Sequence, residues 1–139
     1  MQRAIEAAKA CEQEIAIGAV IVKNGEVISS ACNKKEELKD VTAHAEILAI
    51  RQAEKKLGNW RLSDCELYVT LEPCPMCAWA IIQSGMKAVY FGSYDRNYGA
   101  LGSVVDLRKL ANSKLKVYGG INEDECDKIL KECFKKIRK

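Results

Sequence analysis

Residues 66–92 contain a strand, a helix and a second strand in close succession, and this unit limits the possible folds more than any other part of the sequence. Residues 66–71 and 87–92 are rich in β-branched and aromatic side chains, whereas Pro75 opens a helical segment that Gly85 ends. Two strands joined by a crossover helix pair in parallel, with a right-handed connection. A parallel pair needs cover on both faces. The unit therefore predicts an α/β fold.

The other predicted elements fit around this unit. Residues 15–22 and 26–32 flank Asn24-Gly25, a dipeptide typical of a type I′ turn, so an antiparallel hairpin is expected. Periodicity and stop signals predict further elements: helices over 2–12, 43–57, 105–111 and 123–137, a strand over 115–118, and a charged loop over 34–40.

These elements add up to one α/β domain, residues 1–139, with a single mixed five-stranded sheet covered by helices. The helix over 43–57 has Asp40 or Thr42 as its expected N-cap and Gly58 as its C-terminal stop.

The seven cysteines are an odd number, and residues 1–10 carry charges in place of a long apolar run, so a disulfide-framed secreted module is excluded. No apolar run reaches the roughly 18 residues needed to cross a membrane. The sulfurs are therefore expected as metal ligands or as core residues of a reduced, cytoplasmic protein. The last helix carries a predicted core stripe: Cys126, Ile129, Leu130, Cys133 and Ile137.

Two short segments supply candidate metal ligands. His44, the only histidine, opens one predicted helix, and Cys74 and Cys77 lie in the first turn of another. Residues three apart share a helix face, so both thiols can bind one ion. These three ligands suit tetrahedral Zn²⁺ and leave a fourth position for water. The alternatives are a structural zinc site, for which no fourth ligand is evident, and a redox Cys-x-x-Cys pair.

Glu46 lies two residues after His44 and is the candidate general acid and base. Zinc lowers the pKa of a bound water from about 15.7 towards about 7, and a nearby carboxylate can then take the proton. On a regular helix, residues two apart point about 200° away from each other. The assignment therefore requires His44 and Glu46 to lie at the very start of the helix. The alternative is an ordinary surface glutamate.

The helix over residues 75–84 is almost entirely apolar, including Trp79, Ile81 and Ile82. A helix without a polar face is expected to be buried on all sides. In a domain this small, one face can cover the sheet and the other is expected to meet a second subunit. The alternative is that loops of the same chain cover it.

The positive charge is concentrated near the C-terminus. Residues 1–107 hold 12 basic and 14 acidic side chains, a net −2, whereas residues 108–139 hold 10 and 5, a net +5. Such a patch can attract phosphates, although a solvated helix face would explain it as well. The candidate phosphate contacts are Lys135, Lys136, Arg138 and Lys139. Tyr94 and Tyr98 are candidates for stacking on unpaired bases, or for simple packing.

The segments His44-Ala45-Glu46 and Pro73-Cys74-Pro75-Met76-Cys77 form the pattern H-x-E…P-C-x-x-C, with which the sequence resembles the zinc nucleobase deaminases. Flanking blocks resemble the tRNA-specific adenosine deaminases within that superfamily. They include Ile17-Gly18-Ala19-Val20, Cys32-Asn33, Asn59-Trp60-Arg61-Leu62, Tyr90-Phe91-Gly92 and Gly102-Ser103.

This resemblance implies a three-layer α/β/α cytidine-deaminase-like fold, a homodimer with one zinc ion per subunit, and deamination of adenosine to inosine at the wobble position of a tRNA anticodon stem-loop. It also implies that Glu46 protonates the adenine ring nitrogen and the leaving ammonia, while Asn33 and the backbone at Ala45 hold the flipped-out base. Two alternatives remain: a deaminase of free guanine or cytosine, or a non-catalytic zinc subunit that helps a partner bind RNA.

Overall fold

The computed structural model describes residues 1–137, so Arg138 and Lys139 lie outside the described residues. The elements are α1 (Gln2–Lys9), β1 (Gly18–Lys23), β2 (Glu26–Cys32), α2 (Lys35–Leu38), α3 (Ala45–Leu57), β3 (Cys65–Leu71), α4 (Pro75–Ser84), β4 (Ala88–Ser93), α5 (Leu107–Ala111), β5 (Lys116–Tyr118) and α6 (Glu123–Ile137). None of the helices within residues 1–137 has the length and apolar character needed to span a membrane.

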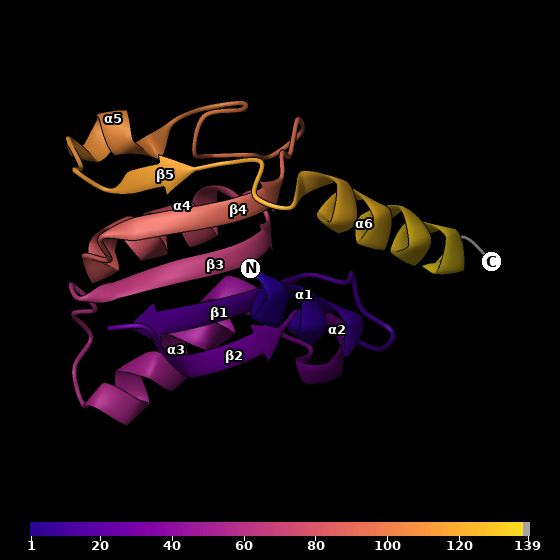
Figure 1. Cartoon of the computed structure of the whole chain (residues 1–139), viewed down its shortest axis with the longest axis horizontal. Coiled ribbons are helices and arrows are strands. Elements are labelled where there is room, and N and C mark those ends of the chain that lie inside the picture. Colours follow the sequence, from indigo (N-terminus) through magenta and orange to yellow (C-terminus); the bar gives the residue numbers. More distant parts are fainter. Residues whose placement is uncertain (138–139) are drawn as a thin grey trace.

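The five strands form one mixed sheet in the order β2-β1-β3-β4-β5 (Figure 1). Strands β3 and β4 are parallel, as are β4 and β5, whereas β1 runs antiparallel to both of its neighbours. Asn24 and Gly25 both have positive φ, as a type I′ turn requires, and Lys23 pairs with Glu26 across it. The predicted hairpin and parallel pair are confirmed.

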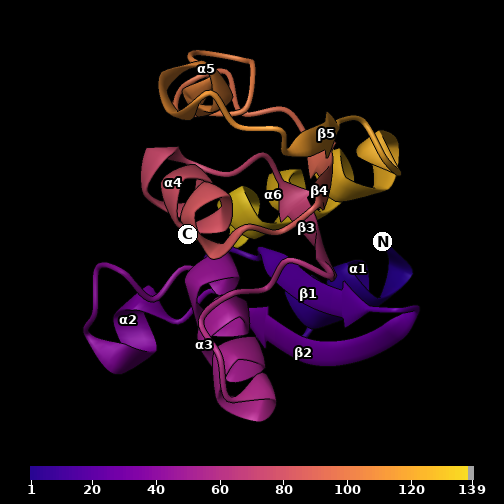
Figure 2. The same cartoon turned by 90° about the vertical axis from the view of Figure 1, so that its left-hand side faces the viewer.

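Helices cover both faces of the sheet and make three layers (Figure 2). On one side, α3 and α4 close the larger core, which includes Leu67, Val69 and Ile81. On the other side, a smaller cluster joins Ile5 of α1 to Cys126 of α6. The three-layer α/β/α arrangement is confirmed.

The two helices of the smaller layer, α1 and α6, pack closely against the sheet. A Cβ added at Gly18 would lie 2.5 Å from the backbone nitrogen of Ala8 in α1, and one added at Gly92 would lie 2.8 Å from Cβ of Cys126 in α6. Glycine at these two strand positions therefore lets each helix approach the sheet more closely than a side chain would allow.

The segment before β1 differs from the prediction. β1 begins at Gly18 and not at residue 15, because the preceding residues bond outside the ladder: the amide of Ala16 donates to Sγ of Cys133 (3.3 Å). Likewise, α1 ends at Lys9 and the expected loop over 34–40 contains α2. The carboxylate of Glu14 accepts hydrogen bonds from the amides of Glu36 (3.1 Å) and Glu37 (2.8 Å), which holds α2 in place.

The cysteine prediction is only partly correct. All seven cysteines are free, and Cys65 and Cys126 are buried, but Cys11, Cys32 and Cys133 are only half-buried. Ile137, the last residue of the predicted stripe on α6, is 56% exposed. The stripe fails there because α6 extends past the edge of the sheet, beyond the elements that could cover it (Figure 1).

Candidate metal centre and active site

Helices α3 and α4 each begin next to a predicted metal ligand. His44 is the N-cap of α3, and Cys74 is the N-cap of α4, both with extended backbone. Pro75 fits the first helical position of α4, where its missing N–H costs nothing. The unbonded amides and the positive dipole end of a helix favour negative charge, so the start of α4 favours thiolates over thiols.

The three predicted ligands lie together. Nδ1 of His44 lies 3.7 Å from Sγ of Cys74 and 3.5 Å from Sγ of Cys77. The three ligand atoms all lie within 4.8 Å of one another. With Zn–N near 2.05 Å and Zn–S near 2.3 Å, a tetrahedral site has an N···S edge of about 3.6 Å. The spacing and the donor set therefore fit zinc with three protein ligands and an open fourth position.

The two thiols and the imidazole are electrostatically coupled. A hydrogen bond with Cys77 lowers the pKa of Cys74 to about 4, and the neighbouring His44 lowers it further. The same Cys74–Cys77 hydrogen bond, with burial, raises the pKa of Cys77, and the hydrogen bond to Cys74 raises the pKa of His44. The three side chains therefore share protons. A divalent cation that binds them displaces these protons, because metal ligands bind in their deprotonated forms.

Glu46 is in the first turn of α3 and is only 4% exposed. Burial raises the pKa of its carboxyl to about 7, against the lowering effects of a hydrogen bond from its own backbone amide, of the nearby His44 and of a hydrogen bond with Cys77. The 200° separation expected on a regular helix does not apply, because His44 precedes the helix. Both side chains therefore approach the same thiol, and a carboxyl with a near-neutral pKa at this position is suited to proton transfer.

The expected N-cap of α3 was wrong. Oδ1 of Asp40 accepts hydrogen bonds from the amide (2.8 Å) and the hydroxyl (2.7 Å) of Thr42, which closes a local turn. The helix therefore starts at Ala45, two residues later than predicted. His44 makes no capping hydrogen bond with its side chain, so its ring faces the two thiols instead.

The two predicted base-holding positions lie near the start of α3. Asn33 directly follows β2 and is 7% exposed, and Ala45 is fully buried as the first residue of α3. The amide of Lys34 donates to the carbonyl of Ala43 (2.9 Å), which ties the segment after β2 to the one that leads into His44. The amide of Ala45 has no acceptor within its helix, because Ala45 is the first residue of α3.

The predicted tyrosines differ in their surroundings. The ring of Tyr94 packs edge-on against Phe91, with centroids 5.0 Å apart, whereas Tyr98 is 68% exposed. Tyr98 is therefore the freer of the two to stack on a base.

The sequence reasoning missed Glu72, which is 1% exposed and receives hydrogen bonds from the loop that carries Tyr98. The sequence signal that could have identified Glu72 is the position of an acidic residue between an apolar strand and Pro73.

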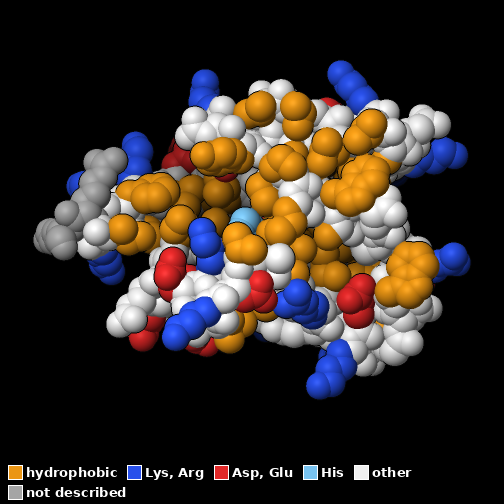
Figure 3. All heavy atoms as spheres, turned by 180° about the vertical axis from the view of Figure 1, so that it is seen from behind, with side chains coloured by type: hydrophobic (Ala, Val, Ile, Leu, Met, Phe, Trp, Pro, Cys, Tyr) orange, Lys and Arg blue, Asp and Glu red, His pale blue; other side chains and the backbone are white. Residues whose placement is uncertain are grey.

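The face that carries α3 and α4 exposes many hydrophobic side chains, with the single histidine among them (Figure 3). Trp79 of α4 is 39% exposed, and Met76 and Ala80 are half-buried. The apolar helix is thus not buried on all sides within one chain. Its uncovered part remains available to a second protein surface.

Comparisons with known proteins agree with this site. The family described as the cytidine and deoxycytidylate deaminase zinc-binding region matches residues 1–93. A tRNA-specific adenosine deaminase of Bacillus subtilis is 44% identical and aligns with 100% of this chain and 89% of its own length.

Solved structures with the same fold include deaminases of different substrates. A structure from work on A-to-I editing by tRNA:A34 deaminases at the wobble position superposes with a TM-score of 0.86 and 41% identity, over 93% of this chain and 96% of that one. Guanine deaminase from Bacillus subtilis superposes with a TM-score of 0.64 and 44% identity, over 67% of this chain and 61% of that one. The chain belongs to the zinc-dependent cytidine and deoxycytidylate deaminase family and, within it, to the tRNA-specific adenosine deaminases.

Proposed function

We propose that residues 1–139 form one deaminase domain that hydrolyses adenosine to inosine and ammonia at the wobble position of a tRNA anticodon. The observation that carries the proposal is the convergence of one imidazole nitrogen and two sulfurs within 4.8 Å beside a buried carboxyl. Relatives named for tRNA-specific and tRNA:A34 deamination, which align along almost the whole chain, support RNA as the substrate.

His44, Cys74 and Cys77 hold one zinc ion per chain in this proposal. The ion supplies Lewis-acid activation of a water molecule. The start of α4 stabilises the thiolate forms of both cysteines, because its free amides and dipole favour negative charge. The N-cap position of His44 directs Nδ1 toward both thiols.

Glu46 moves the protons. Its carboxyl takes a proton from the attacking water and delivers it to the adenine ring nitrogen as the new C–O bond forms at C6. It then takes the second proton, from the hydroxyl now on C6, and delivers it to the amino group, which leaves as ammonia while the C6 carbonyl forms. Its near-neutral pKa suits both directions of transfer. Asn33 and the amide of Ala45 orient the base, since both lie on segments that meet at the start of α3.

The anticodon stem-loop is the proposed partner because adenine in a single-stranded loop can be turned out of the stack at low cost. Lys135 and Lys136 are exposed at the end of α6 and supply positive charge for phosphates. Tyr98 supplies an exposed ring for stacking.

We further propose a homodimer, formed through the uncovered side of α4 that includes Trp79. The apolar character of this side supports the proposal, since water-exposed hydrophobic surface of this kind marks interfaces. A reduced, cytoplasmic location is consistent with the seven free cysteines and with a tRNA substrate.

Deamination of a free base is the second candidate, because guanine deaminase shares the fold and 44% identity over part of the chain. A non-catalytic zinc subunit is disfavoured by the buried Glu46, which such a subunit would not need.

Ammonia release measured side by side on three substrates separates the candidates. The substrates are an anticodon stem-loop with a wobble adenosine, free guanine and free cytosine, with a stem-loop that carries guanosine at the wobble position as the control. We expect turnover of the adenosine stem-loop alone. Turnover of a free base without turnover of the RNA would reverse the substrate assignment, and turnover of none by zinc-loaded protein would favour the non-catalytic subunit.

A further inference from the structure

Glu72 is a buried acidic residue that the proposed chemistry does not use. It is 1% exposed and lies two residues before Cys74. Its carboxylate accepts hydrogen bonds from the amides of Asp95 (3.2 Å), Leu101 (3.2 Å) and Ser103 (3.1 Å), and from the hydroxyl of Ser103. All four donors belong to one segment, residues 95–103, which we call the 95–103 loop.

The 95–103 loop packs directly against the segment that leads into α4. The amide of Ala100 donates to the carbonyl of Pro73 (2.9 Å), next to Cys74. A Cβ added at Gly99 would lie 2.6 Å from Oε1 of Glu72, so the loop backbone passes immediately beside this carboxylate. Leu101 is only 3% exposed and anchors the loop in the core.

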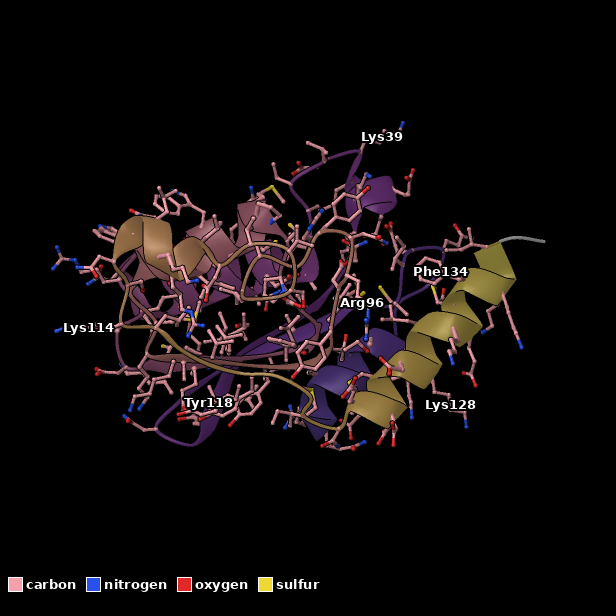
Figure 4. The ribbon with its side chains drawn as sticks, turned by 90° about the horizontal axis from the view of Figure 1, so that it is seen from above. Lys39, Arg96, Lys114, Tyr118, Lys128 and Phe134 are labelled. Atoms are coloured by element: carbon pink, nitrogen blue, oxygen red, sulfur yellow. The ribbon has the colours of Figure 1, made fainter. Side chains whose placement is uncertain are left out.

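The same loop leaves other side chains in solvent. Tyr98 is 68% exposed, and Arg96 is exposed on the side of the molecule toward α6 (Figure 4). Arginine and tyrosine are the side chains that contact phosphates and stack on unpaired bases. The loop therefore joins a rigid inner edge, bonded to Glu72, to an outer edge suited to RNA.

A direct part in the chemistry does not fit Glu72. Both carboxylate oxygens are occupied by donors of the loop, and its side chain is closed off from solvent. Removal of the carboxylate would leave three amides and a hydroxyl of the loop without their acceptor. The amide of Leu101 is buried, where a donor without an acceptor is strongly unfavourable, and the bonds from Asp95 and Ser103 are partly buried. The loop would then leave its position to hydrate these groups.

We propose that Glu72 is a positioning residue for RNA: it fixes the 95–103 loop beside the start of α4, so that Arg96 and Tyr98 meet the nucleotides that flank the target base. This proposal rests on the function proposed above. A free base that contacts only the metal centre does not need the loop, whereas a stem-loop does. Loss of Glu72 should therefore weaken RNA binding much more than it slows the chemical step.

The test compares zinc-loaded parent protein with Glu72→Ala and Glu72→Gln by steady-state kinetics on the anticodon stem-loop and by amide hydrogen exchange. For Glu72→Ala we expect one zinc per chain, at least tenfold faster exchange in the 95–103 loop, a KM raised about tenfold, and a kcat within about threefold of the parent. Glu72→Gln keeps one oxygen acceptor and should fall between the two. If Glu72→Ala does not fold, Ser103→Ala removes one of the four bonds and should give a smaller KM increase.

Ile5→Ala is the matched control, because Ile5 is fully buried in the cluster on the opposite face of the sheet. It should lower stability without changing KM or exchange in the loop. Unchanged loop exchange in Glu72→Ala would show that Glu72 does not position the loop. Faster exchange with an unchanged KM, or a loss confined to kcat, would remove the loop from RNA binding. If the parent does not deaminate the stem-loop, the proposed function fails, and the positioning of the loop for RNA fails with it; the exchange data still report whether Glu72 holds the loop.

Discussion

Replacement of Glu46 by glutamine separates proton transfer from metal binding. The change keeps the shape of the side chain, which is 4% exposed at the first turn of α3. It removes a group that can gain and lose a proton, and general acid–base catalysis contributes about 10²- to 10⁴-fold to rates. We therefore expect the single-turnover rate constant to fall by that factor, an increase of about 2.7 to 5.4 kcal/mol in the activation barrier.

Folding and zinc binding should survive this substitution. Burial is the largest of the influences that raise the pKa of the Glu46 carboxyl to about 7, so the ionised form is disfavoured where it lies. A neutral amide removes that cost, and its oxygen still accepts a hydrogen bond from Cys77, so we expect the free energy of unfolding to change by no more than about 1 kcal/mol. The three predicted zinc ligands are untouched.

The assay measures single-turnover deamination of the anticodon stem-loop together with zinc content and urea unfolding. Glu54→Gln is the matched control, since Glu54 lies two turns further along α3 and is away from the metal centre. It should retain the parent rate. A Glu46→Gln variant that keeps one zinc and reacts within threefold of the parent would refute the assignment of Glu46 as the proton carrier.

Three further predictions test the metal centre, the packing of α6 against the sheet, and an ion pair. Cys74→Ala should reduce zinc from one per chain to nearly none by metal analysis, and full retention would contradict the ligand assignment. Gly92→Ala places Cβ 2.8 Å from Cβ of Cys126, which should lower the free energy of unfolding measured in urea by about 1–3 kcal/mol. An unchanged unfolding midpoint would contradict the close packing of α6 against β4. The hydrogen bond with Arg108 lowers the pKa of Asp106, so its stabilisation is present at neutral pH and is lost as the pH falls through the folded-state pKa. Asp106→Asn should therefore cost about 0.5–1 kcal/mol at pH 7 and progressively less toward pH 3, and a pH-independent difference would contradict the charge argument.

The sequence predicted the parts of the fold that depend on local signals. Asn24-Gly25 specifies its turn because both residues must adopt positive φ, and Pro75 and Gly85 mark the two ends of α4. Helix α2 was missed because its N-terminal amides are held by Glu14, more than 20 residues earlier in the chain. A single-turn helix stabilised by such a distant carboxylate carries little signal in its own residues.

The same distinction applies to the site. His44, Cys74 and Cys77 could be identified by residue type and spacing, but the spacing alone could not say how His44 and Glu46 approach one thiol. That depends on the extended backbone of His44, which follows from the turn that Asp40 closes upstream. The role of Glu72 could not be predicted, because its four donors come from a loop more than 20 residues later.

The topology explains why these distant residues meet. Because β2 and β3 both run antiparallel to β1, and β4 runs parallel to β3, the strands β2, β3 and β4 all point the same way. Their carboxyl ends lie at one edge of the sheet, where ligands bind in open α/β sheets. Asn33 follows β2, Cys74 follows β3, and the 95–103 loop follows β4. The segment that follows each of these strands thus contributes one part of the site at the same edge. The Asn24-Gly25 turn lies at the opposite edge of the sheet, so substitutions there should leave the substrate site intact.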